Sequence, residues 1–565
     1  MALAPTMAAP RFSILTPVHD TPPGVLKKML RSVKRQSFAD WELCLVDDCS
    51  PAPHVRQMLE RAQAADRRVR VEYREVNGGI VAASNDALRM AEGEFVALLD
   101  HDDELHPDAL AHVAAAIDAN PEADYVYTDE DKIDLNGHHS QPFFKPDWSP
   151  ERMRTQMYTC HLSVLRRSLV EEVGGFDPEF EGSQDWDLVL KVTERARAVL
   201  HVPRVLYHWR LLKTSAAAAA AAKPWAFEAG PRAVQAHCDR IGLPAKVEQD
   251  PADPGVLHLR PQLTEQPLVS IVIPTGGQVR DVRFEPVVLV VNCVRSIVER
   301  STYENYEIVC VVDDSVGQSV RDELQALAGE RLRLVEFSGP FDFSAKVNQG
   351  AIHSEGKHLL LLNDDIEITT PEWLDRMVMY SEREGIGAVG AKLVWGDTRL
   401  QHVGLSFEYG LPNHLYRGFA GDFTGYMNDV LIARNCLAVT GACLMTRRDV
   451  FEEMGGLTRE FPVNFNDVDY CLKVHSSGRR IVYDPDLVLF HFESSSRVAE
   501  VEKWEFELLV ERWRRVAAVD PYNNPNLHRG VPRLTANFGW ARRKRAQLPW
   551  RLRRRPSIDS TPSGG

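Results

Sequence analysis

An internal duplication is the strongest constraint that this 565-residue sequence places on its fold. An apolar segment ending in two aspartates, a second apolar segment ending in acids, an acid pair after a double glycine, and a histidine occur twice in this order. The segments are residues 41–50, 93–105, 173–192 and 205–210 in the first copy, and residues 306–315, 356–368, 454–474 and 488–493 in the second. Because chance is a poor explanation for four segments that recur in order, the sequence predicts two related domains in tandem.

Each copy alternates short apolar runs with stretches of helical periodicity. In the first copy we expect strands at 11–18, 41–46, 69–73 and 95–99, and helices at 24–34, 54–64, 80–90 and 107–120. This alternation predicts an α/β fold with a doubly wound, mostly parallel sheet in each domain. In such sheets ligands bind beyond the carboxyl ends of the strands, which is where the paired aspartates fall.

Changes in composition suggest where the domains begin and end. We expect a first domain at 11–215, a helical and proline-rich connector at 216–265 that begins with an alanine run, and a second domain at 266–500. Residues 501–535 follow as a C-terminal helical region, and residues 536–565 as a basic tail that we expect to be disordered.

The composition is that of an ordinary globular protein, with 44% hydrophobic and 26% charged residues. No apolar run approaches the roughly 20 residues that a membrane-spanning helix needs. The first residues lack the pattern of a secretion signal, and the nine cysteines form no CxxC pair. We therefore expect a reduced, cytoplasmic protein.

The basic charge is segregated. The net charge is −14, yet residues 541–556 contain eight Lys or Arg and no acid. A solvated tail without a partner fits this segment, and so does peripheral contact with the anionic inner face of the cell membrane. Nucleic-acid binding is disfavoured because the acidic remainder of the chain would repel phosphates.

The acids of residues 100–103 suggest a metal site. Carboxylates clustered at a strand end repel one another unless a positive group joins them. Asp100 and Asp102 offer the hard oxygen ligands that suit Mg²⁺ or Mn²⁺. Taken alone, this segment could equally be a generic acidic turn.

Together with other segments of the first copy, this motif resembles glycosyltransferase family 2, the inverting nucleotide-sugar transferases with the GT-A fold. The other segments are TPVHD (16–20), VDDCS (46–50), NGGIVAASN (77–85), QDWDL (184–188) and His208. The resemblance implies that Asp185 is the general base and that Asp100, Asp102 and His208 hold Mn²⁺ or Mg²⁺ against the donor diphosphate. It also implies nucleotide contacts from Thr16, Pro17, Asp47, Asp48, Asn77 and Gly79.

The second copy resembles the same family, and its segments 341–351 and 401–404 are similar to those of rhamnosyltransferase-like members. The resemblance implies a base at Asp467, metal ligands at Asn363, Asp365 and His491, and nucleotide contacts at Pro274, Asp313, Asp314 and Asn348. Asn363 stands where the first copy has an aspartate. An amide keeps an oxygen ligand but removes one negative charge, so we expect weaker metal binding there.

These features predict a bifunctional transferase that uses UDP- or dTDP-linked sugars and a lipid-linked or polymeric glycan acceptor, in bacterial surface polysaccharide synthesis of the O-antigen or capsule type. One alternative is a single active domain with a degenerate, acceptor-binding copy. Another is a non-catalytic scaffold that binds nucleotides or glycans. A nucleotidyltransferase is a third, but it should show a glycine-rich basic loop after the first strand, and residues 16–24 are not such a loop.

Overall fold

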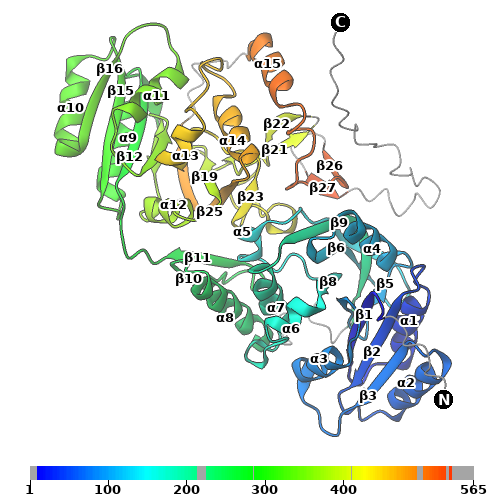
Figure 1. The fold of residues 1–565 in the computed structure, drawn as a ribbon. Coiled ribbons are helices and arrows are strands. Elements are labelled where there is room, and N and C mark those ends of the chain that lie inside the picture. The colour runs from blue at the N-terminus through cyan, green and yellow to red at the C-terminus, as the bar shows by residue number, and fades with distance from the viewer. Residues whose placement is uncertain are drawn as a thin grey trace, which may run out of the picture.

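The computed structural model describes residues 9–212, 224–283, 285–408, 410–492, 501–529 and 534–536, and it shows two sheet-centred bodies (Figure 1). The first body contains β1 (Phe12–Val18), α1 (Pro23–Lys34), β2 (Trp41–Asp47), α2 (Pro53–Ala65), β3 (Val69–Tyr73), α3 (Gly79–Met90), β4 (Phe95–Leu98), β5 (Glu104–Leu105), α4 (Ala109–Ala119), β6 (Ala123–Ile133), β7 (His139–Phe143), α5 (Pro150–Met153), β8 (Ser163–Arg166), α6 (Arg167–Glu172), α7 (Gln184–Thr193) and β9 (Ala198–Arg210). Helix α8 (Pro224–Arg240) and the hairpin of β10 (Ala245–Gln249) and β11 (Leu257–Pro261) follow.

The second body contains β12 (Val269–Thr275), β13 (Val279–Val282), β14 (Glu285–Val288), α9 (Leu289–Arg300), β15 (Tyr306–Asp313), α10 (Gln318–Ala328), β16 (Leu332–Phe337), α11 (Phe343–Ile352), β17 (His358–Leu362), β18 (Ile366–Ile368), α12 (Trp373–Ser381), β19 (Ile386–Val394), β20 (Leu400–His402), β21 (Leu405–Glu408), β22 (Leu411–His414), β23 (Arg434–Cys436), β24 (Cys443–Arg447), α13 (Arg448–Glu453), α14 (Asn466–Ser476) and β25 (Arg480–His491). The chain continues through α15 (Lys503–Trp513), β26 (Leu527–Arg529) and β27 (Leu534–Ala536).

The two sheets have the same topology. The strand order is β3-β2-β1-β4-β8-β6-β9-β5 in the first and β16-β15-β12-β17-β24-β19-β25-β18 in the second. At corresponding places the pairings are parallel around β1 and β12 and antiparallel on both sides of β8 and β24. The predicted tandem α/β fold is confirmed, with sheets that are mixed beyond their parallel first halves.

Burial explains why these segments form these elements. Every residue of β2 is buried, as expected for a parallel strand covered on both faces. In α1 the buried apolar residues recur with helical periodicity, at Val25, Leu26, Met29, Leu30 and Val33, so one face of the helix packs on the sheet.

The predicted metal histidines do not lie at equivalent positions of the two sheets. Strand β9 skips residues 203, 204 and 206 where it pairs with β6, and β25 skips residues 485–487 where it pairs with β19. Both strands thus skip three residues, and beyond the skips Tyr207 is equivalent to Leu489. His208 therefore lies one position before the place of His491, and side chains one position apart point to opposite faces of the sheet.

The one-residue offset between the two histidines is also visible where the short edge strands pair. Glu104 and Glu367 are equivalent, since they follow the equivalent strands β4 and β17 at the same spacing. Glu104 lies opposite His208, whereas Glu367 lies opposite Phe490. His208 thus takes the place of Phe490, and Trp209 takes the place of His491.

Buried polar contacts join the two bodies. Ser149 Oγ donates to Asn435 Oδ1 at 2.8 Å, and Thr155 Oγ1 donates to the carbonyl of Ala433 at 3.0 Å. Buried Glu151 forms an ion pair with Arg480 at 3.2 Å. The two bodies therefore pack directly on each other. The expected limits of the domains, at residues 215 and 266, stay a prediction.

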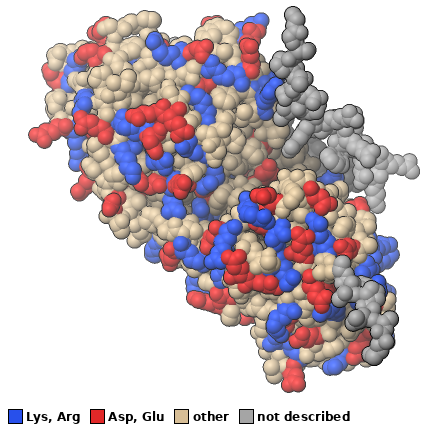
Figure 2. All heavy atoms as spheres, in the orientation of Figure 1, with Lys and Arg blue, Asp and Glu red and all other residues tan. Residues whose placement is uncertain are grey.

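Charge and hydropathy of the described residues add two observations. Figure 2 shows Lys and Arg interspersed with Asp and Glu over the viewed face of both bodies. Within the described residues, no helix has both the length and the apolar character needed to cross a membrane. The alanine run at 216–222 and the basic segment 541–556 lie outside the described residues.

Candidate active sites

The second body has a cavity of about 760 Å³ at the carboxyl ends of its strands. Residues predicted to bind the donor and to catalyse transfer line it together: Pro274, Asp313, Asn363, Asp365, Asp467 and His491. They come from the ends of β12, β15, β17 and β25 and from the first turn of α14. A cavity of this size lies within the range of roughly 300–1,000 Å³ found for small-molecule sites.

His491 meets the acidic strand end in this cavity. Its Nε2 lies 3.0 Å from Asp365 Oδ1 and 3.4 Å from the Asn363 amide nitrogen. Its Nδ1 lies 2.6 Å from the side-chain oxygen of Gln401. A hydrogen bond from Nδ1–H to that oxygen leaves Nε2 as the nitrogen that faces the acids.

Asp467 is held at the start of α14. Its carboxylate accepts hydrogen bonds from the backbone N–H groups of Gly441 and Val468, each at 2.8 Å. Burial raises the pKa of Asp467 above its ordinary value, and these two hydrogen bonds oppose the shift. The neighbouring acid Asp364 accepts a hydrogen bond from Thr275 Oγ1 at 2.6 Å, and burial followed by the charge of Asp365 raises its pKa to about 7.

The predicted nucleotide contacts of the second body divide into two groups. Asp313 lines the cavity and forms an ion pair with buried Lys346 at 2.5 Å, while Asp314 accepts a hydrogen bond from Ser338 at 2.9 Å. Asn348 has a different position from the one expected. Its amide makes two hydrogen bonds to the backbone of Leu457, at 2.8 and 2.9 Å, so it fastens α11 to a loop instead of facing a nucleotide.

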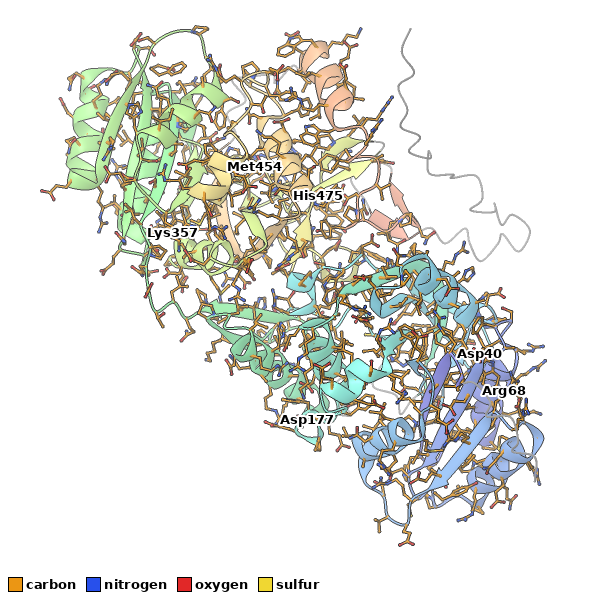
Figure 3. The ribbon with its side chains drawn as sticks, in the orientation of Figure 1. Asp40, Arg68, Asp177, Lys357, Met454 and His475 are labelled. Carbon is orange, nitrogen blue, oxygen red and sulfur yellow. The ribbon has the colours of Figure 1, made fainter. Side chains whose placement is uncertain are left out.

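The corresponding cavity of the first body is much smaller, about 20 Å³. It is lined by Pro17, Asp100, His161 and Asp185, among others. Asp185 lies in the first turn of α7, as Asp467 lies in α14. Asp177, labelled in Figure 3, precedes this helix and pairs with Lys191 of α7 at 3.1 Å.

Asp185 has the electrostatics of a group that can exchange a proton near neutral pH. Burial, followed by the negative charge of Asp100, raises its pKa to about 6. The positive charge of His161 acts in the opposite direction. A carboxyl group with such a pKa is suited to general-base chemistry.

Three aspartates cluster beside this cavity. Carboxylate oxygens of Asp100, Asp102 and Asp103 lie within 4.8 Å of one another. Asp103 accepts hydrogen bonds from Tyr207 Oη at 2.6 Å and from the backbone N–H of Arg210 at 2.7 Å. Burial raises the pKa of Asp102, which is expected where like charges meet in a partly desolvated strand end.

The structure does not bring His208 to this cluster. Its Nδ1 lies 2.7 Å from Asp131 Oδ1, and the centroids of the His208 and His139 rings are 4.6 Å apart. The side chain lines a separate cavity of about 420 Å³ together with Lys28 and Arg31 of α1. This corrects the expectation that His208 acts beside Asp100 and Asp102, because His208 lies at the strand position of Phe490 and not at that of His491.

Several other predicted residues of the first body have structural partners. Asp48 accepts hydrogen bonds from the backbone N–H groups of Gly78 and Gly79, at 2.8 and 2.9 Å, so it shapes the loop that was expected to touch the nucleotide. Asn77 lies beside the carbonyl of Asp48, and Asp47 accepts the Ser50 N–H. Thr16 is fully buried.

His161 is the residue of this site that the sequence analysis missed. It comes just before β8, and its Nε2 lies 3.7 Å from Asp100 Oδ2. At the equivalent place before β24 the second body has Ala442, which lines the larger cavity. The sequence signal was a histidine in the first copy at the position where the second copy has an alanine. That difference alone does not indicate a functional residue.

The donor atoms of both cavities fit a hard divalent cation. Asp365, Asn363 and His491 would hold it in the second body, and Asp100 and Asp102 would do so in the first. These are mainly oxygen ligands, with one imidazole nitrogen in the second body, a set compatible with Mn²⁺ or Mg²⁺.

A match to a family profile identifies the family of this chain. The profile described as glycosyl transferase family 2 matches residues 13–174 and 270–455, one stretch in each body. The chain belongs to glycosyl transferase family 2. The resemblance drawn from the sequence motifs is therefore confirmed for both copies.

Relatives of this family-2 chain include two long ones. It is 40% identical to an uncharacterized protein of Sinorhizobium fredii, over 92% of this chain and 58% of that protein. It is 35% identical to the O-antigen biosynthesis protein RfbC of Myxococcus xanthus, over 93% of this chain and 41% of that protein. The chain thus spans about half the length of these relatives. Among solved structures, S. aureus TarS in complex with UDP is 23% identical over 40% of this chain and 65% of that one, with a TM-score of 0.33.

Proposed function

We propose that this chain is a metal-dependent, inverting glycosyltransferase with one donor site in each body. The observation that carries the proposal is the same in both. A strand-end acidic motif and a helix-start aspartate lie in one cavity at the carboxyl end of the sheet. UDP- or dTDP-linked sugars are the proposed donors.

The proposed mechanism assigns one proton transfer to each body. Asp185 or Asp467 takes the proton of the acceptor hydroxyl as its oxygen attacks the anomeric carbon and the bond to the diphosphate breaks. A bound Mn²⁺ or Mg²⁺ would supply positive charge for the departing diphosphate. The strand-end residues hold the donor in place, so positioning contributes much of the rate.

Cavity size supports a second candidate, in which only one body turns over a donor. The second-body cavity of about 760 Å³ has room for a nucleotide sugar, whereas about 20 Å³ in the first does not. On this candidate the second body is the transferase despite Asn363, and the first serves the acceptor. The degenerate copy would then be the first body, whereas the Asn363 substitution suggests that it is the second.

We also propose a lipid-linked or polymeric glycan acceptor in surface polysaccharide synthesis, on the cytoplasmic side of the membrane. The name of the M. xanthus relative supports this acceptor class. The basic segment 541–556 would contact anionic lipid.

The test is release of nucleoside diphosphate from a panel of nucleotide sugars with Mn²⁺ or Mg²⁺. We expect Asp185→Asn and Asp467→Asn each to abolish turnover of a different donor and leave the other intact. If only Asp467→Asn loses turnover, the single-site candidate replaces the two-site proposal. If the wild type turns over no donor with lipid-linked acceptors present, the transferase proposal itself fails.

A further inference from the structure

We propose that His161 is the histidine ligand of the metal in the first body, and that His208 has no part in that site. The inference rests on the proposed function, because it names a residue of the same site. It starts from the comparison of the two bodies of one chain.

Each body presents one imidazole Nε2 to a strand-end aspartate of the acidic motif. In the second body the distance from His491 Nε2 to Asp365 is 3.0 Å, and in the first the distance from His161 Nε2 to Asp100 is 3.7 Å. Two ligand atoms that are each about 2.1 Å from one ion lie roughly 3.0 to 4.2 Å apart. Both pairs fall within this interval.

In both bodies a side-chain oxygen lies near the other ring nitrogen. Gln401 Oε1 is 2.6 Å from Nδ1 of His491. In the first body, Glu130 Oε2 is 3.5 Å from Nδ1 of His161 and also accepts its backbone N–H at 3.1 Å. The Gln401 contact is an outer hydrogen bond of the kind that orients the ring of a metal-binding histidine and favours coordination through the opposite nitrogen. Glu130 makes no such bond to His161 Nδ1 and holds His161 through its backbone N–H.

Three residues that contact His161 are buried, namely Glu130, Lys145 and Tyr207. Lys145 Nζ lies 3.1 Å from Glu130 Oε2 and donates to the carbonyl of His161 at 2.6 Å. The imidazole stacks on Tyr207, with ring centroids 4.6 Å apart and planes 22° apart. The phenol of Tyr207 in turn donates to Asp103, which ties His161 to the acidic cluster.

The one-residue offset of His208 from the place of His491 explains why a different histidine is needed. Trp209 takes the place of His491 in the sheet, and its ring lies 5.2 Å from that of His161. A histidine ahead of β8 therefore reaches the space that the strand-borne histidine occupies in the second body. The equivalent residue there, Ala442, is too small to do so.

Mn²⁺ binding to the full-length chain, followed by electron paramagnetic resonance, tests the assignment. The His491→Ala background removes the second site. In that background we expect His161→Ala to weaken the remaining Mn²⁺ binding at least tenfold, and His208→Ala, the matched control, to leave it unchanged. The reverse pattern would overturn the assignment. Wild type that binds no Mn²⁺ would overturn the metal dependence proposed above as well, so the two failures are distinguishable.

A second variant guards against a merely structural effect of His161→Ala. We expect His161→Cys to bind Cd²⁺ with an ultraviolet sulfur-to-cadmium charge-transfer band beyond that of the wild-type cysteines, because a thiolate is a soft ligand. If His161→Cys adds no band while the wild type binds Mn²⁺, the proposal is contradicted.

Discussion

At the scale of single residues, the helix-start aspartate of the first body combines reactivity with a cost in stability. The pKa of Asp185 is about 6 in the folded chain and ordinarily 3.8. Above about pH 6 the carboxylate is charged in both the folded and the unfolded chain, so the full cost of burying that charge is present. Below the ordinary pKa the group is protonated in both states, and the cost disappears.

The first prediction concerns removal of the buried Asp185 charge. Asp185→Asn should raise the midpoint of thermal unfolding at about pH 7.5, and it should change the midpoint little at about pH 3.5, where Asp185 is already neutral. First-body turnover in the wild type should fall as the pH drops through about 6, because the base becomes protonated. Thermal melts at both pH values and a pH–rate profile check this. Equal stabilisation at both pH values would contradict it.

The same scale shows where sequence reasoning succeeds and where it fails. Residues 184–188 and 466–469 identify a helix-start aspartate in each copy, and the structure places both in a cavity. Asn348 was expected at a nucleotide edge, and the structure places its amide on the backbone of Leu457. Leu457 is distant in sequence and the contact uses only its backbone, so no residue type in the sequence indicates it.

At the scale of elements, the repeated strand and helix pattern predicts both sheets. Short apolar runs specify buried strands, and stretches with helical periodicity specify amphipathic helices. The segments 205–210 and 488–493 align without a gap, and this alignment matches His208 with His491. The strand pairings instead match His208 with Phe490, because these two lie opposite the equivalent Glu104 and Glu367, and such pairings are tertiary contacts. For this reason the role of His208 could not be predicted from its own segment.

Helix α11 gives a prediction at this scale. A Cβ added at Gly350 would overlap Val272 Cγ1 and lie 3.0 Å from Val311 Cγ2, because the helix packs closely on β12 and β15. We expect Gly350→Ala to destabilise the second body by about 1–3 kcal/mol, the usual cost of overpacking a core. Chemical denaturation measures it.

Gly24→Ala is the matched control for this experiment. Gly24 also lies in a helix, α1, but nothing is within 4 Å of an added Cβ. This substitution should be neutral or stabilise by up to about 1 kcal/mol, through helix propensity. If both variants were stabilised, the close packing of α11 on the sheet would be disproved.

At the scale of the whole molecule, the chain that follows the second body returns to support the first. Asn524 is buried, and its Nδ2 donates to both carboxylate oxygens of Asp129, at 3.0 and 3.1 Å, and to the carbonyl of Lys145 at 2.8 Å. Figure 1 shows this C-terminal segment between the two bodies. Asp129 precedes Glu130 in the sequence, and Lys145 Nζ contacts the Glu130 carboxylate, which accepts the backbone N–H of His161.

This contact predicts a long-range effect on the first active site. Asn524→Asp would place a carboxylate against Asp129, and repulsion between the two charges should displace the Lys145–Glu130–His161 network. We expect first-body donor turnover to fall at least tenfold while second-body turnover changes less than twofold. Asn526→Ala is the control. Asn526 lies in the same segment, and its side-chain amide donates to the carbonyl of Pro203 at 3.0 Å and not to Asp129. Equal losses in both bodies would mean that the segment stabilises the chain as a whole and does not act through the first site.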